Sequence, residues 1–186
     1  MLTFEKILKK VMAYRPDFDR ERLVRAYNYA CRFHEGQYRL SGDSYMTHVL
    51  AVLDILLSLQ PDEDTLVAAM LHGLTTKPYD AAEITRLFGH NVALLLNAFA
   101  GLRRVKARDQ NIEAESIRRM FMSMAKDLRV VLIKMADRLH NMQTIGFHPA
   151  AKQKQIARET LDVYVPISAR LGIYHMKGQL EDRAFH

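Results

Sequence analysis

Cysteine, glycine and proline are scarce in this chain of 186 residues, and tryptophan is absent. The single cysteine, Cys31, excludes an intrachain disulfide and any zinc site built from several thiolates. Because only 8 glycines and 5 prolines interrupt the sequence, long helices are favoured over a loop-rich fold.

Long apolar runs are also missing. No stretch approaches the ~18 apolar residues that a membrane-spanning helix needs. The first residues carry Lys6, Lys9 and Lys10 among apolar positions but lack the apolar centre of a secretory signal peptide. We therefore expect a cytoplasmic protein without a membrane span.

Acidic residues are the minority among the charges, with 21 Asp and Glu against 27 Lys and Arg, which gives a formal net charge of +6. A basic balance favours anionic partners, either nucleotide phosphates or nucleic acid. It is equally compatible with a solvated basic surface that binds nothing in particular.

Apolar residues recur at helical spacing along nearly the whole chain, and no segment shows the alternation typical of a strand. There is no internal repeat or low-complexity segment, so the sequence predicts one compact all-α domain. A basic stretch over 103–109 is expected to be a loop. The predicted helices cover residues 3–14, 20–37, 45–59, 65–74, 80–88, 91–100, 112–124, 127–144, 151–164, 166–172 and 174–186.

The predicted helix over 127–144 places polar groups in the stripe that should face the core. Lys134, Asp137 and Asn141 fall at the same three- and four-residue steps as the apolar residues around them. A buried carboxylate needs a partner. Asp137 is either a structural acceptor paired with Arg138 or another arginine, or a metal ligand.

Two histidines have equally apolar neighbourhoods. His48 begins one apolar helix and His72 ends another, so both imidazoles are expected to point inward. A lone inward histidine is usually a satisfied core residue. Two of them with one inward Asp137 form a ligand set that suits a divalent metal and phosphate chemistry. We expect these three side chains to converge on one pocket.

Several blocks of sequence occur in an order and at gaps that resemble the RelA/SpoT homologues, which make and degrade (p)ppGpp. They are His-Glu-Gly-Gln-Tyr-Arg-Leu-Ser-Gly at 34–42, Tyr-Met-Thr-His at 45–48, Phe-Gly at 88–89, and the stretches 133–142, 158–161, 166, 169–172 and 177–182. The resemblance covers about residues 20–186 and lies in the N-terminal hydrolase domain of that family. It implies an HD-type phosphohydrolase fold over 1–186, with 1–19 as a helical extension and a synthetase domain expected to follow.

The resemblance also implies where the family's metal centre should be. The family holds manganese with a His, a His-Asp pair and a distant Asp, and the matching positions are His48, His72, Gly73 and Asp137. Gly73 offers no side-chain ligand. No tightly bound cofactor is therefore expected, although Mn²⁺ would be required if hydrolysis were retained.

A second departure concerns the water that attacks the substrate. The family's Glu-Asp pair, which activates and orients that water, matches Thr76 and Lys77. Together with Gly73, these two positions replace three carboxylates of the family and add one lysine. The stretch should therefore bind a cation poorly, and it leaves no obvious base to deprotonate water. The nearest acidic residues that could substitute are Asp80 and Glu83.

The nucleotide-binding positions are better preserved. The resemblance assigns an arginine that stacks on guanine and several residues that line the base, ribose and phosphates, and their chemistry suits those roles. Lys77 would add a contact to phosphate. The expected nucleotide-binding residues are Arg39, Ser41, Lys77, Lys134, Asn141 and Thr144.

Three functions follow from the sequence. The leading one is a hydrolytically inactive domain that binds a guanine nucleotide or regulates an attached synthetase in the stringent response, without direct binding to nucleic acid. The second is a residual (p)ppGpp 3′-pyrophosphohydrolase that uses His48, His72 and Asp137. The third is a purely structural or interaction scaffold.

Overall fold

The protein is described by a computed structural model over residues 2–103, 122 and 126–185. Within these ranges the regular structure is helical, and the β-type pairing is an isolated antiparallel bridge between Tyr38 and Ser44. The predicted all-α class is confirmed. The predicted loop over 103–109 and the predicted helix over 112–124 lie outside the described residues, apart from residues 103 and 122.

The described elements follow the predicted helices closely. They are α1 (Phe4–Tyr14), α2 (Arg20–Phe33), α3 (Tyr45–Leu57), α4 (Glu63–Leu71), η1 (His72–Thr76), α5 (Ala81–Phe88), α6 (His90–Arg103), α8 (Leu128–Gln143), η2 (Ile145–Phe147), α9 (Ala150–Glu159), η3 (Thr160–Tyr164), α10 (Val165–Arg170) and α11 (Tyr174–Phe185). None of the helices within the described ranges is long and apolar enough to cross a membrane.

Short polar side chains fix where several helices begin. The carboxylate of Asp62 accepts the backbone N–H of Thr65 at 2.8 Å at the start of α4, and Asp80 does the same for two residues of α5. Such N-caps satisfy amide groups that have no partner inside the helix. Asp127 caps α8 in the same way, so the helix that carries Asp137 begins at a defined residue.

Several boundaries differ from the prediction, and three of them bear on the site or on its packing. The helix expected over 20–37 ends at Phe33, because Gly36 adopts a φ of +68°, which continues the chain into a turn rather than a helix. The helix expected over 65–74 ends at Leu71, and His72 begins a 3₁₀ turn. The helix expected over 151–164 is α9 followed by the π-helical turn η3.

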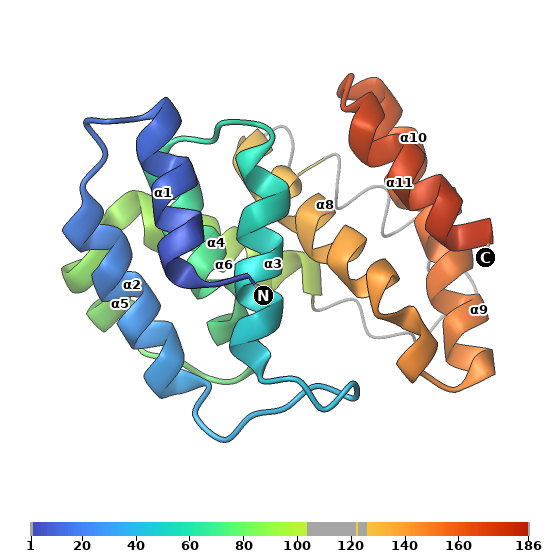
Figure 1. The fold of residues 1–186 in the computed structure, drawn as a ribbon, viewed down its shortest axis with the longest axis horizontal. Helices are drawn as coiled ribbons and strands as arrows, with labels where there is room; N and C mark the ends of the chain where they lie inside the picture. Colours follow the sequence, from blue (N-terminus) through green and yellow to red (C-terminus); the bar gives the residue numbers. More distant parts are fainter. Residues whose placement is uncertain (1, 104–121, 123–125, 186) are drawn as a thin grey trace.

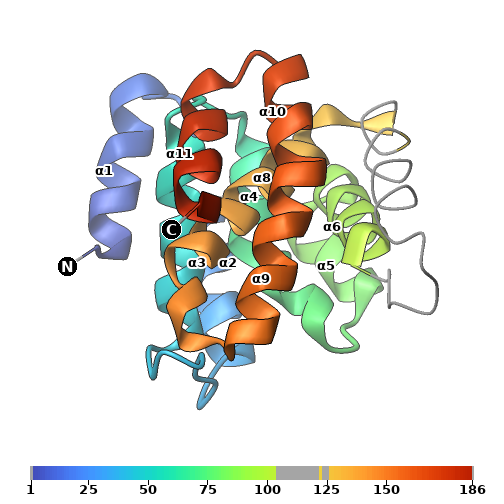
Figure 2. The ribbon, with the colours of Figure 1, turned by 90° about the vertical axis from the view of Figure 1, so that its right-hand side faces the viewer.

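The helices α3, α4 and α8 form the centre of the fold. Helix α3 packs against α4 and α8, and α2 packs against α4. Figure 1 shows α8 between the N-terminal helices on one side and α9 to α11 on the other. In Figure 2, α9, α10 and α11 lie in front of α8. The interior is filled by fully buried aliphatic and aromatic side chains, including Leu53, Leu66, Met70, Val131 and Phe99. This packing fixes the inward faces of α3, α4 and α8 relative to one another.

Candidate metal and nucleotide site

Three predicted ligands converge where the central helices meet. His48 comes from α3, His72 from the start of η1 and Asp137 from α8, and their exposed fractions are 2%, 1% and 7%. One potential ligand atom from each lies within 4.8 Å of the other two. The structure therefore brings together the three side chains that the sequence predicted to share a pocket.

The spacing within this trio suits a cation. His48 Nε2 lies 3.2 Å from His72 Nε2 and 3.4 Å from Asp137 Oδ1. Ligands bound at ~2.0–2.2 Å and placed at right angles on one metal lie roughly 3 Å apart. The His48–His72 and His48–Asp137 distances are thus close to those between neighbouring ligand atoms on one metal ion.

The hydrogen bonds around the histidines define their tautomers. His72 Nδ1 lies 2.6 Å from the carbonyl oxygen of Ala69, which can only accept, so the proton is on Nδ1 and Nε2 carries a lone pair. His48 Nε2 then carries the proton shared toward His72 and Asp137, and His48 Nδ1 accepts from His140 Nδ1 at 2.8 Å. Burial lowers the pKa of His48 to about 3 and that of His140 to about 4. Both imidazoles are neutral near pH 7, and His48 would bind a cation through Nε2 once the proton on that atom is displaced.

Asp137 is held by two donors on its own helix. Lys134 Nζ donates to Oδ2 at 2.7 Å, and Asn141 Nδ2 donates to Oδ1 at 2.8 Å. Burial alone would raise the pKa of Asp137, but the charge of Lys134 and the hydrogen bond with His48 hold that pKa well below its usual range. The carboxylate is therefore ionised although it is buried.

Of the alternatives for Asp137, the pairing with Arg138 is wrong. Arg138 Nη2 donates to Glu159 at 2.9 Å, and its guanidinium lies 4.2 Å from the ring centroid of Tyr164. Residues at i and i+1 on a helix point in different directions, whereas Lys134 at i−3 lies on the same face as Asp137. Arg138 instead ties α8 to the end of α9.

The position of the family's paired aspartate is closed in the present geometry. A Cβ on Gly73 would lie 2.4 Å from His34 Nε2 and 2.7 Å from a ring carbon of Tyr45, so a side chain fits only if the His34 ring moves. Thr76 and Lys77 are both exposed. The residues present thus fit a cation at three positions and offer no carboxylate at residue 73, 76 or 77.

The two acidic residues considered as substitutes have structural roles. Asp80 accepts the backbone N–H groups of Ala82 and Glu83 at 2.9 and 3.1 Å. Glu83 accepts from the hydroxyl of Tyr29 at 2.7 Å. Both carboxylates are occupied at the start of α5.

A cavity of about 320 Å³ opens beside this trio, large enough for part of a nucleotide. Its lining combines a guanidinium, hydroxyl groups and aromatic rings. Arg39 Nη2 donates to Asn141 Oδ1 at 2.9 Å and to Thr144 Oγ1 at 3.1 Å. Since Asn141 also donates to Asp137, hydrogen bonds connect the cavity to the trio. The lining residues are Tyr38, Arg39, Leu40, Ser41, Tyr45, Thr144, Phe147 and His148.

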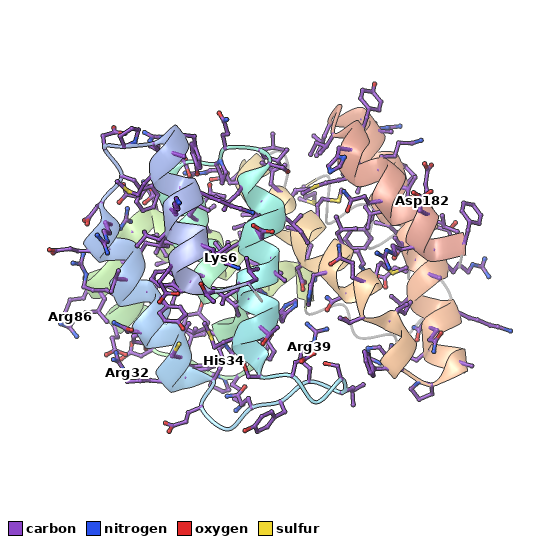
Figure 3. The ribbon with its side chains drawn as sticks, viewed as in Figure 1. Lys6, Arg32, His34, Arg39, Arg86 and Asp182 are labelled. Atoms are coloured by element: carbon purple, nitrogen blue, oxygen red, sulfur yellow. The ribbon has the colours of Figure 1, made fainter. Side chains whose placement is uncertain are left out.

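The six expected nucleotide-binding residues fall into three groups. Arg39, Ser41 and Thr144 line the cavity. Asn141 connects the cavity to the trio through its bonds to Arg39 and Asp137, whereas Lys134 bonds to Asp137 and does not line the cavity. Lys77 is not part of the lining. It lies close to His34, whose pKa is lowered mainly by burial and further by the charge of Lys77. Figure 3 shows Arg39 on the loop that joins α2 to α3, with His34 at the end of α2.

Sequence reasoning missed two histidines and the aromatic lining of the cavity. His140 bonds directly to His48, and His34 occupies the space next to Gly73. Both lie inside the sequence blocks that carried the family resemblance, which was the available signal. Phe147 and His148 had no such signal, because they follow the last turn of α8 in a segment expected only to break the helix.

Comparison with known proteins agrees with this geometry. Residues 26–174, most of the chain, match the family described as HD domain. The chain belongs to this family. Within it, the chain belongs with the RelA/SpoT homologues, because it aligns over its full length, at 43% identity, with the bifunctional (p)ppGpp synthase/hydrolase SpoT of Escherichia coli K12. The expected all-helical HD fold is thereby confirmed.

Other relatives have different names. The GTP pyrophosphokinase of Myxococcus xanthus is 41% identical over 94% of this chain, and that of Streptomyces coelicolor is 46% identical over 88%. The chain spans 27%, 24% and 19% of the lengths of these three proteins, respectively. The HD domain is therefore compared with a part of each relative, and the activity of a whole relative is not carried over from its name.

Proposed function

We propose that this HD domain binds a guanine nucleotide in the Arg39 cavity and hydrolyses (p)ppGpp poorly or not at all, so that it regulates a longer (p)ppGpp-metabolising protein. The observation that carries this proposal is the combination of an open cavity around Arg39 with a centre that has Gly73, Thr76 and Lys77 where the family has carboxylates. Binding groups are present, whereas groups that activate water are absent.

The cavity offers the contacts that a purine nucleotide needs. The planar guanidinium of Arg39 can stack on a base, and Tyr38 and Phe147 add exposed aromatic surface at 71% and 58% exposure. Ser41 and Thr144 present hydroxyl groups to the same cavity. These groups bind a nucleoside without requiring a metal.

Hydrolysis would need a base that the described residues near the trio do not supply. Asp137 is tied to Lys134 and Asn141, and its lowered pKa makes it a weak proton acceptor. Thr76 is neutral at any relevant pH, and the ammonium of Lys77 opposes a cation nearby. Slow or absent turnover follows from this chemistry.

Calorimetry with GDP, GTP and ppGpp, at two salt concentrations and with or without EDTA, tests the proposal. We expect binding that persists in EDTA and weakens as salt rises, because phosphate contacts at the cavity are partly exposed. Arg39→Ala should weaken guanine nucleotides about tenfold, in line with the loss of one stacking cation. Arg86→Ala is the matched control, since its side chain is 72% exposed on α5 and is labelled at the left edge of Figure 3, whereas Arg39 is labelled near the lower centre.

Two outcomes would overturn the proposal. Loss of nucleotide binding in EDTA would mean that a cation organises the cavity. Absence of binding under every condition would favour the scaffold function instead. Lys77→Ala should weaken GDP, GTP and ppGpp about equally, because Lys77 does not line the cavity and acts on phosphate through its charge alone.

A residual 3′-pyrophosphohydrolase remains the second candidate, favoured by the 3.2 and 3.4 Å spacings among His48, His72 and Asp137. Turnover of ppGpp with Mn²⁺ decides between the two. The comparison is the unaltered chain against the variant Gly73→Asp, Thr76→Glu, Lys77→Asp. Turnover by the unaltered chain within tenfold of the variant would favour the second candidate.

A further inference from the structure

His34 carries a buried polar atom without a partner. The residue follows the last residue of α2 and is 3% exposed. Its Nε2 is buried and makes no hydrogen bond with any of the described residues. Leaving such a group unsatisfied costs about 1–3 kcal/mol. A cost of this kind in an otherwise well-bonded interior points to a ligand.

The hydrogen bonds around His34 show which of its two ring nitrogens carries the proton. Gln37 Nε2 donates to the carbonyl oxygen of Phe33 at 2.7 Å, so the amide oxygen of Gln37 faces His34 Nδ1 at 3.0 Å. His34 Nδ1 therefore carries the proton, and the orphaned Nε2 carries a lone pair. His72 has the same arrangement, with Nδ1 donating to the carbonyl of Ala69. Metal-bound histidines are normally oriented by such a bond from the ring nitrogen that does not bind the metal.

The ring of His34 lies where the missing carboxylate would begin. A Cβ on Gly73 would be 2.4 Å from His34 Nε2 and 2.8 Å from Cε1. The absence of a side chain at Gly73 is what allows the imidazole into this space. His34 Nε2 therefore lies next to Gly73, the residue that follows His72 in the chain.

We infer that His34 supplies the donor that Gly73 lacks, so that His34, His48, His72 and Asp137 form a site for a zinc-like divalent cation. His34 Nε2 is not one of the three atoms within 4.8 Å of one another, so its ring moves toward the trio when the cation binds. This movement must change the stacking of the ring on Tyr45, whose centroid is 4.2 Å away, and its bond to Gln37.

The donor set determines which cation is preferred. Three imidazoles and one carboxylate suit Zn²⁺, whereas manganese favours sites richer in carboxylates. The exchange of a carboxylate for an imidazole thus changes the metal preference rather than only weakening the site. With Lys134 beside Asp137, the loaded centre has a net positive charge, which an anionic oxygen such as that of phosphate would complete.

Metal titration of the chelator-stripped protein tests this inference without any nucleotide, so its outcome is independent of the proposed function. Binding of Zn²⁺ and Mn²⁺ is measured by calorimetry, and Co²⁺ is used as a spectroscopic substitute for Zn²⁺. We expect one Zn²⁺ per chain and tighter binding of Zn²⁺ than of Mn²⁺. His34→Gln and Gly73→Ala should each weaken Zn²⁺ at least tenfold, the first by removing the imidazole and the second by displacing its ring.

His90→Gln is the matched control, because His90 is exposed at the start of α6. A second measurement needs no variant: long-range ¹H–¹⁵N correlation of the imidazoles should show the His34 Nε2 signal shifting when Zn²⁺ is added. Mn²⁺ binding as tight as Zn²⁺, wild-type Zn²⁺ affinity in both variants, or an unshifted His34 signal would each overturn the inference. No Zn²⁺ binding at all would do the same.

Discussion

The buried pair between Lys134 and Asp137 allows a quantitative test of the site's electrostatics. Their side chains are 14% and 10% exposed, and their charged atoms are 2.7 Å apart. Lys134→Met keeps the length and apolar stem of the lysine but removes its charge. The carboxylate then keeps only the donors of Asn141 and His48. Removing one partner of a buried pair costs about 3–5 kcal/mol, and we expect a loss of folding stability in that range.

The same substitution should change how stability depends on pH. In the unaltered protein the folded-state pKa of Asp137 lies below the unfolded value, so its stabilisation is present above about pH 4 and is lost as pH falls through the folded pKa. Without Lys134, we expect burial to outweigh the remaining donors His48 and Asn141, so that the folded pKa of Asp137 rises above the unfolded one. Stability of the variant should then decrease as pH increases above about 4, the opposite sign. Lys134 itself titrates outside this window, because burial lowers its pKa but the charges of Asp137 and Tyr164 together with the hydrogen bond to Asp137 raise it by more.

Urea unfolding in EDTA at several values between pH 3 and 8 measures both effects. Lys10→Met is the matched control, since it removes the same charge from an exposed pair with Asp54, where the side chains are 55% and 34% exposed. It should cost less than about 1 kcal/mol. The double variant Lys134→Met, Asp137→Asn should recover most of the loss, because no charge remains buried. A cost for Lys134→Met no larger than the control, or a double variant no more stable than Lys134→Met, would refute this account of the pair.

Three further substitutions test the frame around the site by thermal or urea unfolding. Arg138→Met should cost about 3 kcal/mol, because it leaves Glu159 without its partner in a partly buried place, and a cost below 1 kcal/mol would contradict the assigned role. Asp62→Ala should cost about 1–2 kcal/mol through loss of the α4 cap, which a helix-preserving Asp62→Asn should largely avoid. Gly36→Ala should destabilise by about 1 kcal/mol because its φ is +68°, whereas Gly178→Ala within α11 should stabilise by a similar amount, and equal effects would contradict the turn assignment.

Helix positions could be predicted because apolar residues recur at helical spacing along most of the chain and because polar side chains cap α1, α2, α4, α5 and α8. The α4–η1 junction could not, since the apolar pattern continues through Leu74 while the hydrogen bonding changes at His72. The side chain of His72 reaches back to the carbonyl of Ala69, three residues earlier. Periodicity records which residues are buried, and it does not distinguish an α-helix from a tighter turn that buries the same residues.

Some features of the candidate site could likewise be predicted from the sequence, and others could not. Convergence of His48, His72 and Asp137 followed from inward faces on separate helices, whose packing the sequence could indicate only in outline. The partner of Asp137 required helix geometry as well as composition, because Lys134 and Arg138 are both cations within one turn of it. The position of His34 beside Gly73 depends on contact between segments about forty residues apart, and no local pattern carries that information.

Retention of the trio is not by itself a sign of retained metal chemistry. His48 bonds to His140 across α3 and α8, His72 bonds within its own turn, and Asp137 bonds to Lys134, so each side chain stabilises the fold without a cation. Folding alone is therefore a sufficient reason for their presence.

The orphaned nitrogen of His34 is different, because it stabilises nothing in the described structure and its burial without a partner costs about 1–3 kcal/mol. An apolar side chain stacked on Tyr45 would fill the same space without that cost. A group that only destabilises the unliganded fold is the kind of feature that a bound ligand explains and that packing does not. His34, rather than the three predicted ligands, is thus the residue whose substitution distinguishes a centre that still binds a cation from one that only holds helices together.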